Sequence, residues 1–159
     1  MYVESRRLSL LTIISLVVAV AALALAGWTL YRSEYSKTEY DPVQIADAKV
    51  EACTAVDVVR RGVSLNTNLA PAGGPGDVTG AQAVAANARV SLYDGGQYLL
   101  ARLDPAAPEH LAETVRDFAN KLMDIGANAT AGAPNDDPKQ AERLKKADEA
   151  NATLTQLCK

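Results

Sequence analysis

The stretch AAPEHLAETVRDFANKLMDIGANA, residues 106–129, has the clearest periodic pattern in this chain of 159 residues. Its apolar side chains recur every three or four residues, which is the spacing of one face of an α-helix. Asp104 and Pro105 precede it and give a helix start signal, because Asp is a good N-cap and Pro is favoured in the first turn. We therefore expect a helix over 106–129 whose buried face consists of Leu111, Val115, Phe118, Leu122, Ile125 and Ala129.

Three further segments carry helical patterns, and loops rich in Gly and Pro separate them. Two of them begin at an Asp-Pro pair with a glutamine three residues after the aspartate, which is a capping-box arrangement. Short loops between amphipathic helices predict an all-α fold, an antiparallel up-down-up-down four-helix bundle. The three helices are expected at residues 42–68, 79–103 and 138–157, with loops at 71–77 and 130–138 and start signals at Asp41–Pro42 and Asp137–Pro138.

The expected core is built from small side chains. Alanine accounts for 29 residues and aromatic residues for only 5% of the chain, a composition typical of helices packed through small side chains. Gly95 and Gly96 interrupt the segment 79–103 and predict a close helix crossing, a kink, or a break into two shorter helices. The apolar stripes are Val43, Ala46, Val50, Cys53, Val56, Val59 and Val63 in the first helix, and Ala141, Leu144, Ala147, Leu154 and Leu157 in the last.

Cys53 lies in the first of these helices, and Cys158 directly follows the last. An up-down-up-down bundle returns the end of its last helix toward its first, so the two cysteines should be neighbours. In an extracytoplasmic domain such a pair predicts one disulfide. Closing a loop of roughly one hundred residues contributes about 4–5 kcal/mol in the chain-entropy model. A redox-active pair, an intermolecular bridge and free thiols are the alternatives.

Before this domain, residues 8–30 read LSLLTIISLVVAVAALALAGWTL and contain no charged residue. As a helix this run is about 34 Å long, enough to cross a hydrocarbon core of about 30 Å. Arg6 and Arg7 precede it, and Trp28 and Tyr31 lie at its far end, where aromatic rings prefer the interface. We expect an uncleaved signal-anchor, single-pass in the plasma membrane, with a cytoplasmic N-terminus and the bulk of the chain extracytoplasmic.

Two alternatives to the anchor stay open. The pattern Ala24-Leu25-Ala26 is compatible with a signal peptide cleaved after Ala26, and the run could also form a buried core helix. With an intact anchor, no cytoplasmic output domain is expected. The predicted organisation is a short cytoplasmic N-terminus at 1–7, a transmembrane helix at 8–31, a juxtamembrane stalk at 32–41 and an extracytoplasmic helical bundle at 42–159.

Composition and motifs argue against several function classes. The chain has 16 Lys and Arg against 19 Asp and Glu, and this acidic balance argues against nucleic-acid binding. One histidine and two cysteines are too few for a zinc site of Cys and His ligands. No phosphate-binding loop, nucleophile elbow or dinucleotide fingerprint occurs. We therefore expect no enzyme, no catalytic, cofactor-binding or metal-binding residue and no cofactor. His110 is interpreted as a solvated side chain and Asp136–Asp137 as a helix cap.

The chain resembles a set of small, alanine-rich, single-pass membrane proteins of mycobacteria and related actinobacteria, which carry no assigned activity. The segment Gly95-Gly96-Gln97-Tyr98-Leu99 and the two cysteines are the most specific parts of this resemblance. It implies a cell-envelope location and an intact anchor. The similar stretches are EACTAVDVVRRGVSLNTN (51–68), AQAVAANARVSLYDGGQYLLARLDP (81–105) and VRDFANKLMDIGANATAGAPNDDP (115–138), together with Cys158.

Two functions follow, and both are binding functions. The first is a scaffolding protein that contacts a membrane or envelope protein assembly, with no oligomeric state predicted. Its possible binding surface is Gly95, Gly96, Tyr93 and Tyr98. The second is a module that binds or senses a small apolar ligand or lipid within the bundle. A buried cavity lined by Tyr98, Leu99 and Phe118 would favour the second function.

Overall fold

The computed structural model describes the backbone of residues 2–35 and 39–159, and the side chains of residues 15–31 and 39–159. The chain divides into two compact units, Met1–Glu39 and Tyr40–Lys159. The predicted N-terminal segment at 1–7 and stalk at 32–41 include residues 1 and 36–38, which lie outside the described residues.

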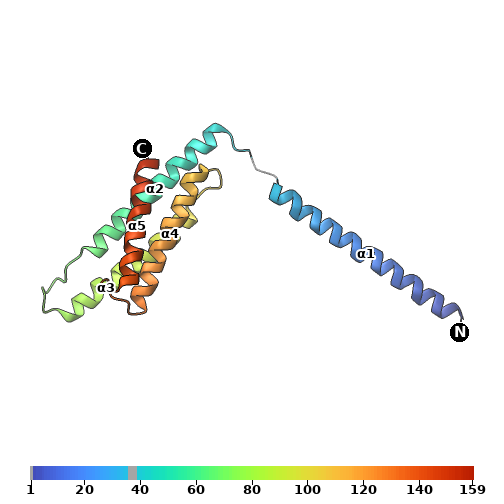
Figure 1. Ribbon diagram of the computed structural model, residues 1–159, viewed down its shortest axis with the longest axis horizontal. Coiled ribbons are helices and arrows are strands. Elements are labelled where there is room, and N and C mark those ends of the chain that lie inside the picture. Colours follow the sequence, from blue (N-terminus) through green and yellow to red (C-terminus); the bar gives the residue numbers. More distant parts are fainter. Residues whose placement is uncertain (1, 36–38) are drawn as a thin grey trace. The chain divides into compact units, whose positions relative to one another are not determined.

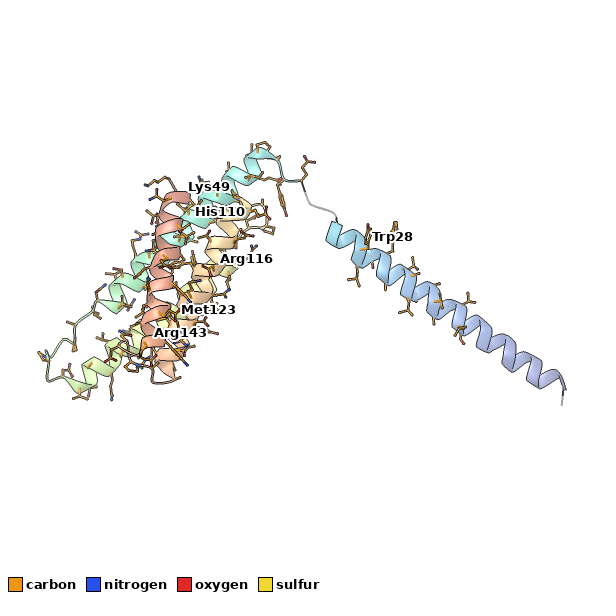
Figure 2. The ribbon with its side chains drawn as sticks, in the orientation of Figure 1. Trp28, Lys49, His110, Arg116, Met123 and Arg143 are labelled. Carbon is orange, nitrogen blue, oxygen red and sulfur yellow. A yellow bond between two sulfur atoms is a disulfide. The ribbon has the colours of Figure 1, made fainter. Side chains whose placement is uncertain are left out.

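The first unit is a single helix, α1, which extends from Tyr2 to Tyr35 (Figure 1). Its described side chains are exposed, and they include Leu23 at 74% and Leu25 at 66%. Trp28, labelled in Figure 2, lies 6.5 Å from Tyr31 between ring centroids. Within the part of the chain that the structure describes, no helix combines the length and the apolar character needed to cross a membrane.

The second unit is a bundle of four helices, so the prediction of an all-helical bundle is confirmed. Successive helices run antiparallel in Figure 1. The central pair is α3 and α4, while α2 packs mainly on α3 and α5 mainly on α4. The helices are α2 (Pro42–Thr67), α3 (Val78–Ala101), α4 (Glu109–Thr130) and α5 (Pro138–Leu157).

Aspartate caps explain where these helices begin, with one exception. Asp41 accepts hydrogen bonds from the amides of Val43 and Gln44, and the Gln44 side chain completes the capping box. Asp137 caps α5 as predicted by accepting from the amides of Lys139 and Gln140, but no capping box forms, because the Gln140 side chain donates to the Ile125 carbonyl instead. The predicted start of α4 at residue 106 is wrong. Asp104 caps a turn there by accepting from the Ala106 amide, and the helix begins at Glu109. The reason is Pro108, which disfavours the helical conformation at the residue before it.

The buried residues match the predicted core closely in α4 but only in part in α2. Five of the six predicted α4 residues are buried, and Ala129 is half-buried. In the first half of α2, however, Val43 and Val50 are 68% and 65% exposed. Ala48 is buried there instead. It belongs to a small cluster of alanines that also contains Ala106, Ala107 and Ala112. The main core residues of α2, α3 and α5 are Ala52, Ala55, Val56, Val59, Leu92, Leu99, Ala147, Ala150 and Leu154.

The glycine pair lies inside a continuous helix, α3, at its closest approaches to two neighbours. A Cβ atom added to Gly96 would lie 2.6 Å from the Ala119 carbonyl oxygen and 2.5 Å from Cγ of Met123. One added to Gly95 would lie 2.9 Å from a methyl carbon of Val59. The close-crossing interpretation is therefore the one the structure supports, with Gly96 facing α4 and Gly95 facing α2.

Candidate functional site

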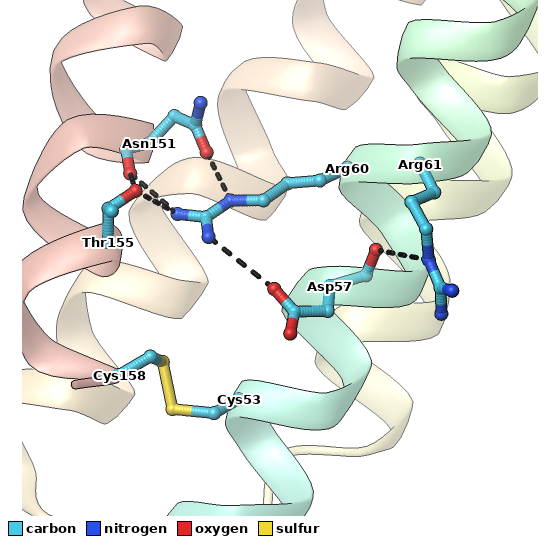
Figure 3. Close-up of polar contacts among 7 residues, drawn as sticks. All are labelled: Cys53, Asp57, Arg60, Arg61, Asn151, Thr155 and Cys158. Atoms are coloured by element: carbon cyan, nitrogen blue, oxygen red, sulfur yellow. Dashed lines mark hydrogen bonds and ion pairs between the residues drawn. A yellow bond between two sulfur atoms is a disulfide. The ribbon is translucent and has the colours of Figure 1, made fainter.

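Two cross-links connect α2 with α5, and both lie in the half of α5 that leads to its C-terminal end. The predicted disulfide between Cys53 and Cys158 is present, with 5.6 Å between their Cα atoms and 105 residues between them in sequence. One to two turns before Cys158 in α5, the Arg60 guanidinium donates to the carbonyl oxygen of Asn151 and the hydroxyl of Thr155, each at 2.7 Å. Figure 3 shows both cross-links side by side.

Beyond Arg60 the two helices diverge and leave a groove of about 860 Å³. Figure 1 shows the end of α2 and the start of α3 leading away from α5. Each of the four helices contributes one stripe of residues to the groove, three or four residues apart, so the groove continues the bundle core to the surface. Its larger apolar side chains are Val63, Val84, Leu92, Phe118, Leu122, Ile125 and Leu144.

The groove exists because alanine occupies positions that would otherwise fill it. Along α3, Ala81, Ala85 and Ala88 line the groove. A bundle normally packs leucine- or isoleucine-sized side chains at such positions, at the density of an organic crystal. Three alanines on one helix face therefore leave a space between α3 and α5. Ala129, Ala133 and Ala147 line the groove as well.

Charged side chains in the groove differ in their partners. Arg60 is engaged, because it also forms an ion pair with Asp57 at 3.6 Å. Arg89 is half-buried in the wall, and no ion pair or side-chain hydrogen bond involves it among the described residues. Asp148 is exposed at the edge. Among the described residues, the groove thus combines an apolar wall with one half-buried arginine that has no charge partner.

The predicted binding surface is not a single surface in the structure. Gly96 is buried against α4, and Gly95 is half-buried against Val59. Tyr93 is 49% exposed and Tyr98 is 37% exposed, and the Arg102 guanidinium carbon lies 5.3 Å from the Tyr98 ring centroid. None of the four lines the groove. Of the three residues expected to line a ligand cavity, Phe118 does, whereas Tyr98 and Leu99 do not.

A shallower hollow between α4 and α5 contains ionisable side chains, with His110 at its rim. His110, labelled in Figure 2, is exposed, as are Glu113 and Glu149. Lys146 binds Glu142 at 2.7 Å on the outer face of α5. The hydrogen bond and charge of Lys146 lower the pKa of Glu142, and Glu142 raises the pKa of Lys146 in return. Across the described residues, no three His, Cys, Asp or Glu side chains are arranged to hold a metal ion.

Sequence reasoning missed the groove and its two arginines. Arg60 and Arg89 are isolated cations in a helical pattern, and such residues are usually solvated. The sequence feature that could have indicated the groove is the alanine spacing in α3, where Ala81, Ala85 and Ala88 fall on one helix face. The high alanine content predicts close helix packing, but a stripe of alanines also occurs where no neighbouring helix reaches it.

Fold and groove together define a disulfide-linked helical domain with an open, largely apolar groove. No protein-family model matches the chain, and comparisons with curated proteins and with solved structures gave no match.

Proposed function

We propose that this protein is a membrane-anchored, extracytoplasmic binding module whose groove accepts an apolar ligand. The groove is the observation that supports the proposal. Its volume of about 860 Å³ lies in the range of small-molecule sites, roughly 300–1,000 Å³. A mostly apolar wall with a few polar groups is also the usual composition of such sites.

Membrane anchoring is part of this proposal, and the features of α1 support it. The uncharged run at residues 8–30 lies entirely within this helix. Its described apolar side chains, such as Leu16 at 67% exposure, have no protein surface to cover them within their own unit. A lipid bilayer would cover such a helix, because its backbone groups are already paired within the helix.

An extracytoplasmic location for the bundle is supported by the disulfide. Structural disulfides persist in oxidising compartments and are rare in the cytosol. Arg6 and Arg7 before the apolar run favour a cytoplasmic N-terminus by the positive-inside rule. A location in the cell envelope, as the actinobacterial resemblance implies, is consistent with both features.

Binding is favoured over catalysis by the chemistry of the lining. Among the residues that line the groove there is no histidine and no cysteine, and Asp148 is its one carboxylate. General acid–base or nucleophilic catalysis needs a base within hydrogen-bond reach of its partner group. The polar groups that do line the groove include amides and guanidinium groups, which can orient a bound molecule.

The test is photolabelling of the full chain in liposomes with a long-chain alcohol that carries a diazirine. Labelled peptides from α3 and α4, displaced by unlabelled alcohol, are the expected result. Ala85→Trp places a large ring in the groove and should abolish most of this labelling. Ala86→Trp is the matched control, because Ala86 is exposed and does not line the groove. Labelling confined to α1 in the unmodified chain would refute the proposal.

Scaffolding of an envelope assembly is the second candidate function. The observation in its favour is a group of exposed apolar side chains where α2 ends and α3 begins: Leu65 at 70%, Leu69 at 53% and Val78 at 70%. Crosslinking and recovery from membranes should then yield one assembly that depends on residues 42–159. Replacing the three side chains with serine should reduce that recovery, whereas Ala85→Trp should leave it intact. Equal recovery with residues 1–41 alone would argue against scaffolding.

A further inference from the structure

The unpaired arginine in the groove indicates what kind of apolar molecule it accepts. Arg89 is anchored where α3 and α4 touch, because a Cβ on Gly126 would lie 3.1 Å from the Arg89 carbonyl oxygen. Its backbone is therefore held in place by the helix packing. Its side chain is half-buried beside Ala85, Ala88 and Leu92.

A guanidinium beside an apolar wall is stabilised by an anionic partner, because an ion pair is less screened there than in bulk water. Arg60 shows the usual arrangement in this domain, since its guanidinium has Asp57, Asn151 and Thr155 as partners. Arg89 has no equivalent partner among the described residues. An anionic group delivered by a ligand would supply it.

The electrostatic setting makes this cation distinctive. Residues 40–159 contain 12 Lys and Arg against 16 Asp and Glu, so the bundle as a whole repels anions. Within the groove, the charge of Arg60 is compensated by Asp57, and Asp148 is exposed to solvent at the edge. Arg89 is therefore the uncompensated cation that an entering anionic ligand meets at the half-buried wall of the groove.

We propose that the groove binds an anionic single-chain amphiphile, with its headgroup on Arg89 and its alkyl chain along the apolar wall. This inference rests on the proposed function and specifies its ligand class. A guanidinium forms two parallel hydrogen bonds with a carboxylate or a phosphate, so a fatty acid and a lysophospholipid offer the same chemistry. The apolar wall for the chain is Leu92, Phe118, Leu122, Ile125 and Leu144.

The test compares two photoreactive probes, palmitate and the corresponding long-chain alcohol, on the full chain in liposomes. Arg89→Gln should raise the half-saturating concentration of palmitate about tenfold, which is the effect of losing one charge-assisted hydrogen-bond pair. It should leave the half-saturating concentration of the alcohol unchanged, and that result would also show that the variant is folded. Arg89→Lys should recover part of the palmitate affinity, because it keeps the charge but cannot form the two parallel hydrogen bonds.

Arg61→Gln is the matched control, since Arg61 is exposed and does not line the groove. This substitution changes the net charge by the same amount and should leave the labelling by both probes unchanged. Competition by unlabelled palmitate and by palmitoyl-lysophosphatidic acid then distinguishes a carboxylate from a phosphate headgroup. Equal palmitate labelling of Arg89→Gln and the unmodified chain would overturn the inference while the binding function stands. Absence of groove labelling by both probes would overturn the proposed function itself.

Discussion

Arg60 of α2 binds Asn151 of α5 at both its backbone carbonyl and its side-chain amide oxygen. The Asn151 carbonyl lies 91 residues away in sequence and also accepts from the hydroxyl of Thr155. Figure 3 shows this contact beside the disulfide. Arg60 and Asn151 also line the groove, so the contact joins α2 to α5 at the end of the groove nearer the disulfide.

Arg60→Ala should lower the free energy of unfolding of the bundle by about 1–3 kcal/mol, because it leaves part-buried acceptors without their donor. Arg60→Lys should recover only part of the loss, since an ammonium cannot reproduce the forked contact. Denaturant unfolding followed by circular dichroism measures both. Arg61→Ala is the neighbouring control. Among the described residues, its guanidinium forms one hydrogen bond, to the Asp57 carbonyl at 3.4 Å, and its effect should stay within about 0.5 kcal/mol. Equal losses for the two alanine variants would contradict the role given to Arg60.

The disulfide should be the largest single contribution to stability in the bundle. Replacing Cys53 and Cys158 by serine together removes a cross-link that closes a loop of 105 residues. We expect a loss of about 2–5 kcal/mol, which compares with a total stability of about 5–15 kcal/mol for a domain. Thermal unfolding with and without reductant checks this. The unmodified chain should lose stability on reduction, whereas the serine variant should not respond.

Gly96→Ala should destabilise the bundle by about 1–3 kcal/mol, because the new methyl group meets a backbone carbonyl that cannot move aside. Gly62→Ala should have the opposite effect. Gly62 is also inside a helix, but a Cβ there meets nothing within 4 Å, so the gain in helix propensity of about 1 kcal/mol should appear undiminished. Melting temperatures of the two variants measure the contrast. A stabilised Gly96→Ala would show that α3 and α4 do not approach as closely as described.

The Glu142–Lys146 pair should give a small stability term that depends on pH. The lowered pKa of Glu142 means that its contribution is complete above the ordinary carboxyl pKa and disappears as the pH falls through the lowered value. The pKa of Lys146 is raised, so its contribution to stability is complete below the ordinary lysine pKa and disappears as the pH rises through the raised value. The stability difference between the unmodified chain and Glu142→Gln should therefore shrink on acidification. Unfolding curves at several pH values test this, and a difference that grows in acid would be inconsistent with it.

Sequence patterns predicted α4 and the disulfide well because both depend on strong local or topological signals. The α4 stripe contains large side chains such as Leu111 and Phe118, whose burial dominates the free energy of packing. The first half of α2 has weaker signals. Ala48 is buried and Val50 is exposed, because close packing against other alanines at that point outweighs the larger side chain. The start of α4 was misplaced because Pro108 acts only on the residue before it.

The groove itself was not predictable from periodicity. A stripe of alanines such as Ala81, Ala85 and Ala88 has the same pattern whether a neighbouring helix covers it or not. In this domain the alanine face stays uncovered because α2 and α5 diverge beyond Arg60. That is an arrangement of helices far apart in sequence, which periodicity does not record. A close crossing at Gly96, by contrast, was one of the three interpretations that the sequence left open, and a kink or a break was not distinguishable from it by pattern alone.

The Cys53–Cys158 bond also determines what a protease can release. Every residue of the groove lies between the two cysteines, so the groove belongs to a covalent ring, and α1 is attached to that ring through the first turns of α2. A single cut in the exposed loop between Pro71 and Asp77 would therefore open the ring without separating any part of it from α1. Only a second cut, or reduction of the bond, would free a fragment.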